Sequence, residues 1–323
     1  MLLGFDIGGT KSAAILGRLH HQTGIEILDK TVLPTNLPVY EMIESLFLAA
    51  ELLLEKHRVP PGDLRGIGIS CGGPLNSQQG IIMSPPNLPG WDHIPITDLA
   101  EKRFHKKVYL QNDANACAVA EWKFGAGRGA RNLIFLTFGT GMGAGLVLDG
   151  KLYSGTCDLA GEVGHLRLAD MGPVGFGKAG SFEGFCSGGG IAQLAQGMAR
   201  EKIQMGKQVA WCPSLRDLPA VTARLVAEAA FSGDSLALAV YEQCARYLGR
   251  GLALLIDILN PELIILGSIF ERAHALLEPV MMEVIGREAL AGSVRVCKIV
   301  PAGLSEQIGD MAALTLAASG ELF

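Results

Sequence analysis

The stretch LLGFDIGGTKSAAILGRL, residues 2–19, decides how this chain is expected to fold. An apolar run at residues 2–7 enters a Gly-Gly-Thr turn, and a second apolar run follows at residues 12–19. Two such runs joined by a tight glycine turn predict a β-hairpin. Paired glycines also let backbone N–H groups come close to a phosphate, because a β-carbon would block the approach. The stretch therefore predicts a phosphate-binding hairpin, with an ordinary hairpin turn as the alternative.

A second glycine turn, GTGMGAG at residues 139–145, lies between apolar runs at residues 132–138 and 146–148. It lacks the G-x-G-x-x-G spacing and joins two strands, whereas a Rossmann glycine turn opens a helix. We therefore do not expect this turn to bind NAD. The P-loop pattern of many nucleotide-binding proteins is also absent from the sequence. Two glycine hairpins, one in each half of the chain, suit a triphosphate held between two domains.

The remaining pattern alternates strands and helices, which predicts an α/β protein. Strands are expected at residues 25–33, 65–71, 107–110, 262–266 and 294–299, with a tight turn at Asp149-Gly150. Helices are expected at residues 41–57, 114–124, 187–199, 220–231, 235–259, 272–287 and 307–318.

Composition narrows the function classes. The chain has 323 residues, 49% of them apolar, and a net charge of −5, which argues against a nucleic-acid surface. Its seven cysteines lie singly, as expected of reduced thiols in a cytosolic protein. No apolar stretch reaches the length of a membrane span, and the N-terminus lacks the basic region of a signal peptide. We expect a soluble cytoplasmic protein without membrane or nucleic-acid partners.

Two carboxylates are candidates for phosphoryl chemistry. Asp6, at the end of the first strand, can bind Mg²⁺ directly or through water, because Mg²⁺ prefers hard oxygen ligands. Asn112-Asp113 follows a strand and precedes a helix, where a carboxylate could accept a proton from a substrate hydroxyl. The alternative for this pair is a helix N-cap, for which Asn and Asp are favoured.

Motifs along nearly the whole chain resemble those of the ROK sugar kinases, within the actin/Hsp70/hexokinase superfamily. They occur in the family's order: DIGGTK at 6–11, NLPGW at 87–91, ND at 112–113, GTGMGAG at 139–145, GEVGH at 161–165, Glu183, NPELIILG at 260–267 and GLSEQIGDMAAL at 303–314. The family also includes repressors with an N-terminal helix-turn-helix domain. Because DIGGT starts at residue 6, the kinase branch is favoured.

The resemblance implies an α/β, two-domain actin-like ATPase (ribonuclease H-like) fold with a cleft between the domains. The smaller domain would comprise residues 1–111 and a C-terminal helix at about 305–323, and the larger one residues 112–304. A homodimer is also implied.

The resemblance further implies ATP- and Mg²⁺-dependent transfer to a sugar hydroxyl, usually O6 of a hexose or N-acetylhexosamine, with Asp113 as general base. The sugar ligands would be Asn87, Asn112, Glu162, His165 and Glu183. The nucleotide and its phosphates would contact Asp6, Gly8, Gly9, Thr10, Lys11, Gly139, Thr140, Gly141 and Gly267. Taken singly, a histidine such as His165 is more often structural, and Glu162 and Glu183 could be solvated charges. Trp91 could stack on a sugar or lie in the core, and we favour the core.

The family's zinc motif, C-x-C-G-x-x-G-C-x-E, aligns with residues 174–183, but Val174, Phe176 and Ser181 stand at its cysteine positions. A structural zinc needs four good ligands, so zinc is not expected. We expect Val174 and Phe176 to form an apolar cluster that orders this loop in place of the metal. A second departure is Ser268, where the family more often has glycine after Gly267.

Two other classes compete with the kinase interpretation. A non-catalytic sugar-binding sensor derived from a kinase would fit the lost cysteines, although the retained Asp6, Asp113 and both glycine turns argue against it. An Hsp70-like ATPase acting on protein clients would need a client-binding domain, for which the chain has no residues to spare.

Overall fold

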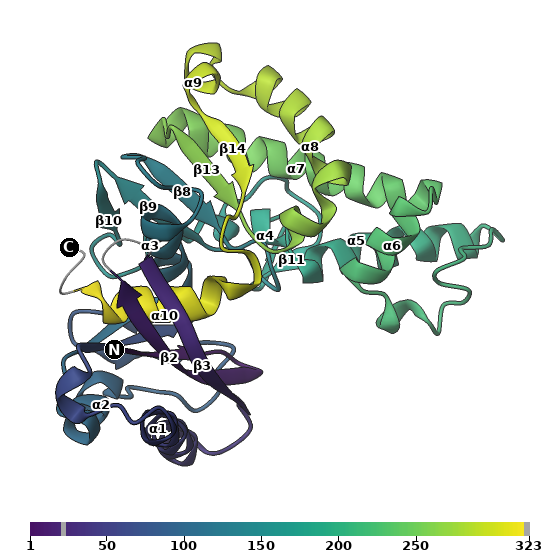
Figure 1. Cartoon of the computed structure of the whole chain (residues 1–323). Coiled ribbons are helices and arrows are strands. Elements are labelled where there is room, and N and C mark those ends of the chain that lie inside the picture. The colour runs from purple at the N-terminus through teal and green to yellow at the C-terminus, as the bar shows by residue number, and fades with distance from the viewer. Residues whose placement is uncertain (21–23, 320–323) are drawn as a thin grey trace. The chain divides into compact units, whose positions relative to one another are not determined.

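The computed structural model describes residues 1–20 and 24–319. The chain packs into two units (Figure 1). Unit 1 contains Met1–Gly129, Gly145–Ala160 and Gly303–Phe323, and unit 2 contains Ala130–Ala144 and Gly161–Ala302. The division into domains at residue 112 remains a prediction, and residues 320–323 of its smaller domain lie outside the described part.

Unit 1 is built on a five-stranded sheet in the order β3-β2-β1-β4-β7. Its strands are β1 (Leu2–Ile7), β2 (Lys11–His20), β3 (Gly24–Pro34), β4 (Gly66–Cys71) and β7 (Val108–Asn112). The first three strands are antiparallel neighbours, whereas β4 and β7 run parallel to β1. The predicted hairpin at residues 2–19 is therefore confirmed.

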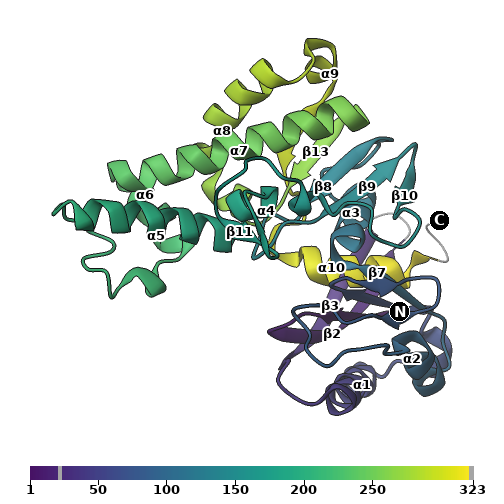
Figure 2. The ribbon, with the colours of Figure 1, turned by 180° about the vertical axis from the view of Figure 1, so that it is seen from behind.

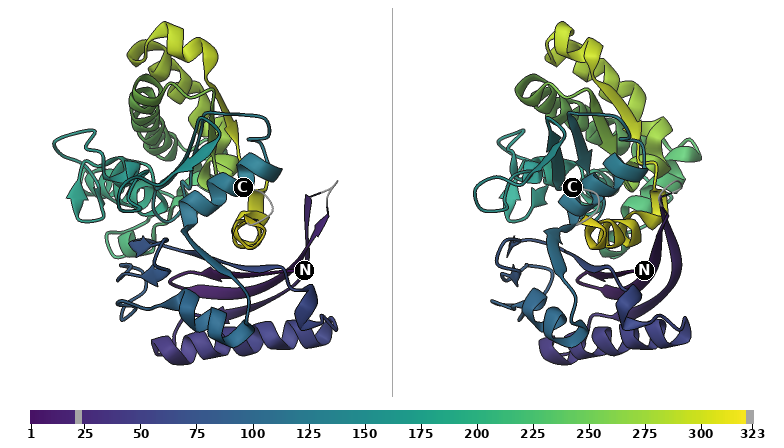
Figure 3. Two further views of the ribbon diagram at one scale, coloured as in Figure 1. Left: turned by 90° about the vertical axis from the view of Figure 1, so that its left-hand side faces the viewer. Right: turned by 60° about the vertical axis from the view of Figure 1, so that its left-hand side comes forward.

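Helices cover both faces of this sheet, as Figure 3 shows for α1 (Val39–Lys56) on one face and α10 (Ile308–Ala317) on the other. Leu3 and Phe5 of β1 pack with α1, while Leu2 packs with α10. A β-carbon at Gly68 would lie only 2.0 Å from the carbonyl oxygen of Ala313, so glycine is what allows α10 to approach this closely. Burial on both faces explains why β1 is apolar except at Asp6.

Further elements complete unit 1. They are α2 (Ile96–Phe104), α3 (Asp113–Phe124), β5 (Leu75–Asn76), β6 (Ile81–Ile82), the short 3-10 helices η1 (Pro61–Asp63) and η4 (Ser305–Gln307), and the antiparallel pair β9 (Ala144–Leu148, of which Ala144 belongs to unit 2) and β10 (Lys151–Tyr153). The β9–β10 pair turns at Asp149-Gly150, as predicted. Trp91 is only 2% exposed, which confirms it as a core residue.

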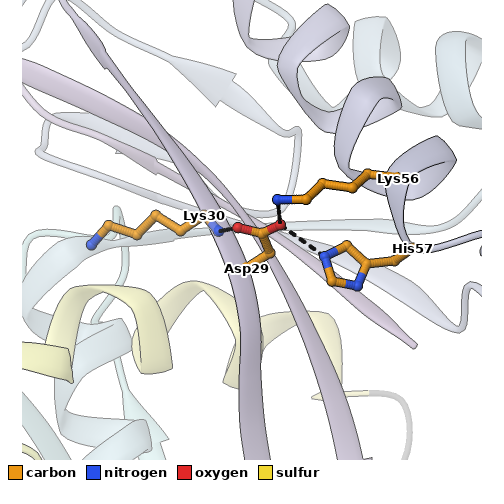
Figure 4. Close-up of polar contacts among 4 residues, drawn as sticks. All are labelled: Asp29, Lys30, Lys56 and His57. Carbon is orange, nitrogen blue, oxygen red and sulfur yellow. Dashed lines mark hydrogen bonds and ion pairs between the residues drawn. The ribbon is translucent and has the colours of Figure 1, made fainter.

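Asp29 and Lys30 are neighbours on β3 that bind elements on opposite faces of the sheet (Figure 4). Asp29 Oδ2 lies 2.8 Å from both Lys56 Nζ and His57 Nε2, at the C-terminal end of α1. Lys30 Nζ donates to both carboxylate oxygens of Asp310, at 3.0 and 2.8 Å, in the first turn of α10. Because successive side chains of a strand point to opposite faces, this dipeptide ties both helices to β3.

Replacing Asp29 with asparagine is expected to lower the melting temperature at pH 7 by a few degrees. Hydrogen bonds from Lys56 and His57 hold the pKa of the Asp29 carboxyl well below its usual range. A carboxyl with a depressed pKa stabilises the fold above its unfolded pKa and loses this contribution as the pH falls. The difference between wild type and Asp29→Asn should therefore shrink below about pH 4 in thermal melts. Glu55→Gln, an exposed change on α1, serves as the control, and a pH-independent difference would contradict the prediction.

Unit 2 contains three parallel strands, β8 (Leu133–Leu136), β13 (Leu263–Leu266) and β14 (Lys298–Pro301), with β13 in the middle. Its helices are α4 (Phe182–Phe185), α5 (Gly188–Gln204), α6 (Ala223–Phe231), α7 (Ser235–Leu259), α8 (Ile269–Glu288) and α9 (Ala291–Val296), with 3-10 turns η2 (Val163–His165) and η3 (Leu218–Ala220). The long helices α7 and α8 lie side by side (Figure 2). A small hairpin, β11 (Val174–Gly175) and β12 (Lys178–Ala179), lies between η2 and α4 in sequence.

One prediction of secondary structure is wrong in part, and one helix was missed. The strand expected at residues 294–299 is instead the end of α9 followed by β14. Alternating valines favoured a strand there, but the pairing partner of β14 is β13, which fixes the strand at Lys298–Pro301. The helix α2 was not expected from the sequence at all.

Candidate functional site

The first glycine turn is packed against the segment that carries Asn87. A β-carbon at Gly9 would lie 2.3 Å from the Asn87 carbonyl oxygen, and one at Gly8 would lie 2.8 Å from the Lys11 carbonyl oxygen. The Gly8 N–H also donates to that Lys11 oxygen, at 3.1 Å. Both glycines are thus required by close backbone approach. Unit 1 therefore brings the predicted phosphate turn, with Thr10 and Lys11 exposed, next to a predicted sugar ligand.

Asp6 lies in β1 just before this turn, largely surrounded by protein. Burial, followed by the nearby Asp113 and Asp310 carboxylates, raises the pKa of Asp6 to about 6, and Lys30 partly offsets this rise. The first turn of α10 approaches Asp6 closely, since a β-carbon at Gly309 would lie 2.9 Å from Asp6 Oδ2. The arrangement concentrates negative charge where a cation would be favourable.

Asn112 and Asp113 occupy the junction between β7 and α3. Asn112 caps the helix, because its Oδ1 accepts from Ala114 N at 2.9 Å and from Asn115 N at 3.4 Å. The cap interpretation is thus correct for Asn112, while Asp113 is the first residue of α3 and accepts from Ala114 N at 2.8 Å. Asp113 keeps access to solvent, yet the protein around it raises the pKa of its carboxyl by desolvation, against the Ala114 hydrogen bond.

Sequence reasoning missed the charged pair beside these carboxylates. Lys30 and Asp310 are separated by 280 residues and meet only in the folded chain. The one available signal was Asp310 itself, a carboxylate within an otherwise apolar closing helix. Asn115, in the first turn of α3, was also missed: it is buried, and its Oδ1 has no hydrogen-bond partner within the described chain.

In unit 2, the second glycine turn is fixed by its own backbone and by Thr137. Thr137 N donates to the Gly143 carbonyl oxygen, and Gly143 N donates to Thr137 Oγ1, both at 3.0 Å. Gly139 N donates to Gly141 O at 3.0 Å. A β-carbon at Gly139 would lie 3.5 Å from Ser268 Oγ, so the turn that carries Thr140 adjoins the segment after Gly267.

Ser268 stands where the family more often has glycine, and its backbone explains that preference. Its φ is 53°, in the left-handed region that favours glycine. Ser268 N donates to Glu271 Oε1 at 2.9 Å, which supports the first turn of α8.

The GEVGH segment is packed onto the second glycine turn. A β-carbon at Gly161, where φ is 91°, would lie 2.0 Å from the Ala144 carbonyl oxygen, and one at Gly164 would lie 2.1 Å from that of Met142. Ala144 N also donates to Gly161 O, at 2.8 Å. The two glycines of the motif therefore exist to let these loops touch.

Three predicted sugar ligands lie around this contact in unit 2. Glu183 Oε2 accepts from Met142 N at 2.9 Å, so this side chain is fixed against the glycine turn. Glu162 precedes the 3-10 turn η2 and His165 is its last residue, and both are exposed. The structure thus groups the predicted residues into one set within each unit.

The loop at residues 165–183 is not ordered by Val174 and Phe176, and that prediction is wrong. Val174, in β11, is 46% exposed, and Phe176, at the tip of the β11–β12 hairpin, is 68% exposed. The positive φ of Phe176, 45°, belongs to this tight turn, in which Gly177 also has positive φ.

Hydrogen bonds and two deeper phenylalanines hold the loop instead. Gln193 on α5 accepts from Val174 N and donates to Val174 O, both at 2.9 Å. Lys178 Nζ donates to the His165 carbonyl oxygen at 2.7 Å. Phe182 and Phe185, which follow the hairpin, are buried. The Phe185 ring stacks on the ring of Tyr247 on α7 at a centroid distance of 3.4 Å. The apolar anchor therefore lies after the hairpin rather than in it.

Removing the two hydrogen bonds between Gln193 and Val174 should make the loop at residues 165–183 more mobile. We expect Gln193→Ala to speed amide hydrogen exchange at residues 165–181 about fivefold, the equivalent of one net hydrogen bond of about 1 kcal/mol. Mass-spectrometric hydrogen exchange measures this. The neighbouring Gln196→Ala change on α5 is the control, and equal exchange in both variants would contradict the role given to Gln193.

Across residues 1–20 and 24–319, no group of three or more His, Cys, Asp or Glu side chains is arranged to hold a metal ion. None of the helices in this part of the chain is long and apolar enough to cross a membrane.

Comparisons with known proteins identify the family and the fold of this chain. The ROK family model matches residues 2–319. A glucokinase of Halalkalibacterium halodurans is 34% identical over 285 residues, covering 86% of this chain and 83% of the relative. The structure of a ROK glucokinase from Streptomyces griseus, in complex with glucose and AMPPNP, superimposes with a TM-score of 0.79 at 29% identity, covering 99% of each chain.

A regulator is also similar. The structure of a ROK family transcriptional regulator, a homolog of the E. coli MLC protein, superimposes with a TM-score of 0.83 at 25% identity and covers 98% of this chain and 77% of its own. The predicted fold class is confirmed: this is the mixed α/β, actin-like two-domain ATPase fold of ROK proteins.

Proposed function

This chain belongs to the ROK family as a sugar kinase, and we propose that it transfers a phosphoryl group from Mg·ATP to a sugar hydroxyl with Asp113 as general base. The acceptor would be O6 of a hexose or N-acetylhexosamine, as in a glucokinase. The observation that carries this proposal is the position of Asp113 at the start of α3, with a raised pKa and Asp6 beside it.

A general base has to be held in place and accept a proton near the working pH. The Ala114 hydrogen bond fixes one carboxylate oxygen of Asp113, and desolvation shifts its pKa in the required direction. Asp113 would take the proton of the sugar hydroxyl as that oxygen attacks the terminal phosphorus. Phosphoryl transfer needs little more from the protein than alignment and charge stabilisation.

The residues around Asp6 fit Mg²⁺. This ion prefers carboxylate oxygens, often takes only one or two from the protein, and keeps waters and substrate phosphates as its other ligands. Asp6 would hold it directly or through water, in a region where neighbouring carboxylates favour a cation. Bound Mg²⁺ would offset the negative charge of the phosphates.

The other predicted residues keep their roles as proposals. Gly8, Gly9, Thr10, Lys11, Gly139, Thr140 and Gly141 would contact phosphates, and Gly267 the nucleotide. Asn87, Asn112, Glu162, His165 and Glu183 would bind the sugar. Their polar groups suit vicinal hydroxyls, because a buried polar group left unpaired is costly. We also propose a cytoplasmic homodimer that acts on small molecules, and the net charge of −5 supports the lack of a nucleic-acid partner.

A coupled ADP-release assay over a panel of hexoses and N-acetylhexosamines tests the proposal and identifies the sugar. We expect sugar-dependent ADP release for at least one member, with product phosphorylated at O6 by NMR. Sugar binding without ADP release for every member would instead support the non-catalytic sensor.

A further inference from the structure

The Glu183 side chain joins two loops of unit 2 to which the proposed function gives different substrates. Its Oε2 accepts from Met142 N at 2.9 Å, in the middle of the turn at residues 139–145. A β-carbon at Gly141 would lie 2.7 Å from the same oxygen. Within the described chain this is the one hydrogen bond that the Glu183 carboxylate makes.

The two loops are packed together on both sides of this bond. A β-carbon at Gly164 would lie 3.2 Å from the Glu183 β-carbon and 2.1 Å from the Met142 carbonyl oxygen. Ala144 N donates to Gly161 O at 2.8 Å, on the other side. Because the two loops are closely packed here, a displacement of the Glu183 side chain is transmitted to the glycine turn at residues 139–145.

The chemistry of this contact runs against nucleotide binding. A phosphate turn works by presenting free N–H groups and a favourable field to an anion. The Glu183 carboxylate occupies the N–H of Met142 and places a negative charge beside Gly141. Two like charges in a partly desolvated site repel each other.

We propose, on the basis of the proposed function, that Glu183 also acts as a positioning residue through which bound sugar raises the affinity of the glycine turn for ATP. A sugar hydroxyl that donates to the carboxylate shares its negative charge and weakens its hold on Met142 N. That N–H is then available to a phosphate oxygen. By linkage, ATP raises the affinity for sugar by the same factor.

The Glu183→Gln variant distinguishes this positioning role from that of a residue that only binds the sugar. Glu183→Gln keeps the size of the side chain and an oxygen that can accept from Met142 N, but it removes the charge. The substitution should therefore weaken sugar binding and, in the absence of sugar, tighten nucleotide binding. A merely structural defect would weaken both.

The test is titration calorimetry of Mg·AMP-PNP with the full chain. It is done without sugar and with whichever of D-glucose, N-acetylglucosamine and N-acetylmannosamine binds most tightly, at saturation. In wild type we expect sugar to raise nucleotide affinity about fivefold to tenfold. In Glu183→Gln we expect the nucleotide affinity without sugar to exceed that of wild type by about threefold. The ratio of nucleotide affinity with sugar to that without sugar should fall to about one.

His165→Gln is the matched control, because it alters another proposed sugar ligand that makes no side-chain contact with the turn within the described chain. It should weaken sugar binding, leave sugar-free nucleotide affinity unchanged and preserve the effect of saturating sugar. An unchanged effect of sugar in Glu183→Gln, or a loss of sugar-free nucleotide affinity, overturns the inference. Failure to phosphorylate any sugar while the binding effect persists contradicts the proposed function alone.

Discussion

Asp113→Asn is expected to lower kcat for sugar phosphorylation by about a thousandfold while sugar affinity stays within about tenfold. Asparagine cannot accept the hydroxyl proton, yet its side-chain oxygen can still accept from Ala114 N, so the start of α3 is retained. The measurements are steady-state kinetics by ADP release and sugar titration by calorimetry.

The same carboxyl predicts a pH profile. Its pKa is raised by desolvation, and only the ionised form is a base, so kcat should fall on the acid side as Asp113 becomes protonated. Asp98→Asn, an exposed change in the first turn of α2, is the control and should retain wild-type kcat. An Asp113→Asn variant with near-full kcat would remove Asp113 from the mechanism.

Asp6→Asn is expected to stabilise the fold while it abolishes most of the activity. The pKa of Asp6 is raised to about 6 from 3.8, so the folded state prefers the protonated carboxyl. Such a group contributes stability below its unfolded pKa and loses it as the pH rises through the folded pKa. At pH 7.5 without magnesium, wild type should therefore be less stable than Asp6→Asn by about 2–3 kcal/mol.

The sign and the window of this effect can both be checked by urea unfolding. The stability difference should be small at pH 4, grow between pH 4 and about 6, and stay level above that. Sugar-dependent ADP release should fall in the same variant, because an amide is a weaker Mg²⁺ ligand than a carboxylate. Destabilisation of Asp6→Asn at pH 7.5 would mean that the carboxylate makes favourable contacts in the fold. The expected result is an instance of the trade-off between stability and activity, because the proposed active site places like charges close together.

The sequence predicted what is local. The hairpin at residues 2–19 follows from two apolar runs and a glycine turn, and the start of α3 follows from Asn112-Asp113. The prediction of the β14 boundary was wrong because pairing with β13, some thirty residues earlier, determines where the strand begins. The valines of the predicted strand at residues 294–299 do not determine it.

The contacts that order the site are mostly long-range, which is why they were missed. Val174 was expected to pack by its apolar side chain, but its backbone is held by Gln193, whose amide gives no apolar signal in the sequence. Lys30 and Asp310 are 280 residues apart. Glu121 is fully buried and accepts from the backbone N–H groups of Ala126, Gly303 and Leu304, a link from α3 to the segment before α10 that periodicity alone would not reveal.

The packing of α10 on β1 also has a consequence for how the chain is made. Residues of α10 cover one face of β1 and β2: Ala313, Leu314 and Ala317 pack against Leu2, Ala13 and Ile15. The first strands to be synthesised are therefore completed only when α10, near the C-terminal end of the sequence, has been made. While the ribosome is still translating unit 2, one face of the nascent sheet stays uncovered and exposed to aggregation. A chain stalled or cut before Ile308 would keep the glycine turn at residues 8–9 but lose the helix that covers one face of its sheet, so we expect such truncated products to be prone to aggregation and proteolysis.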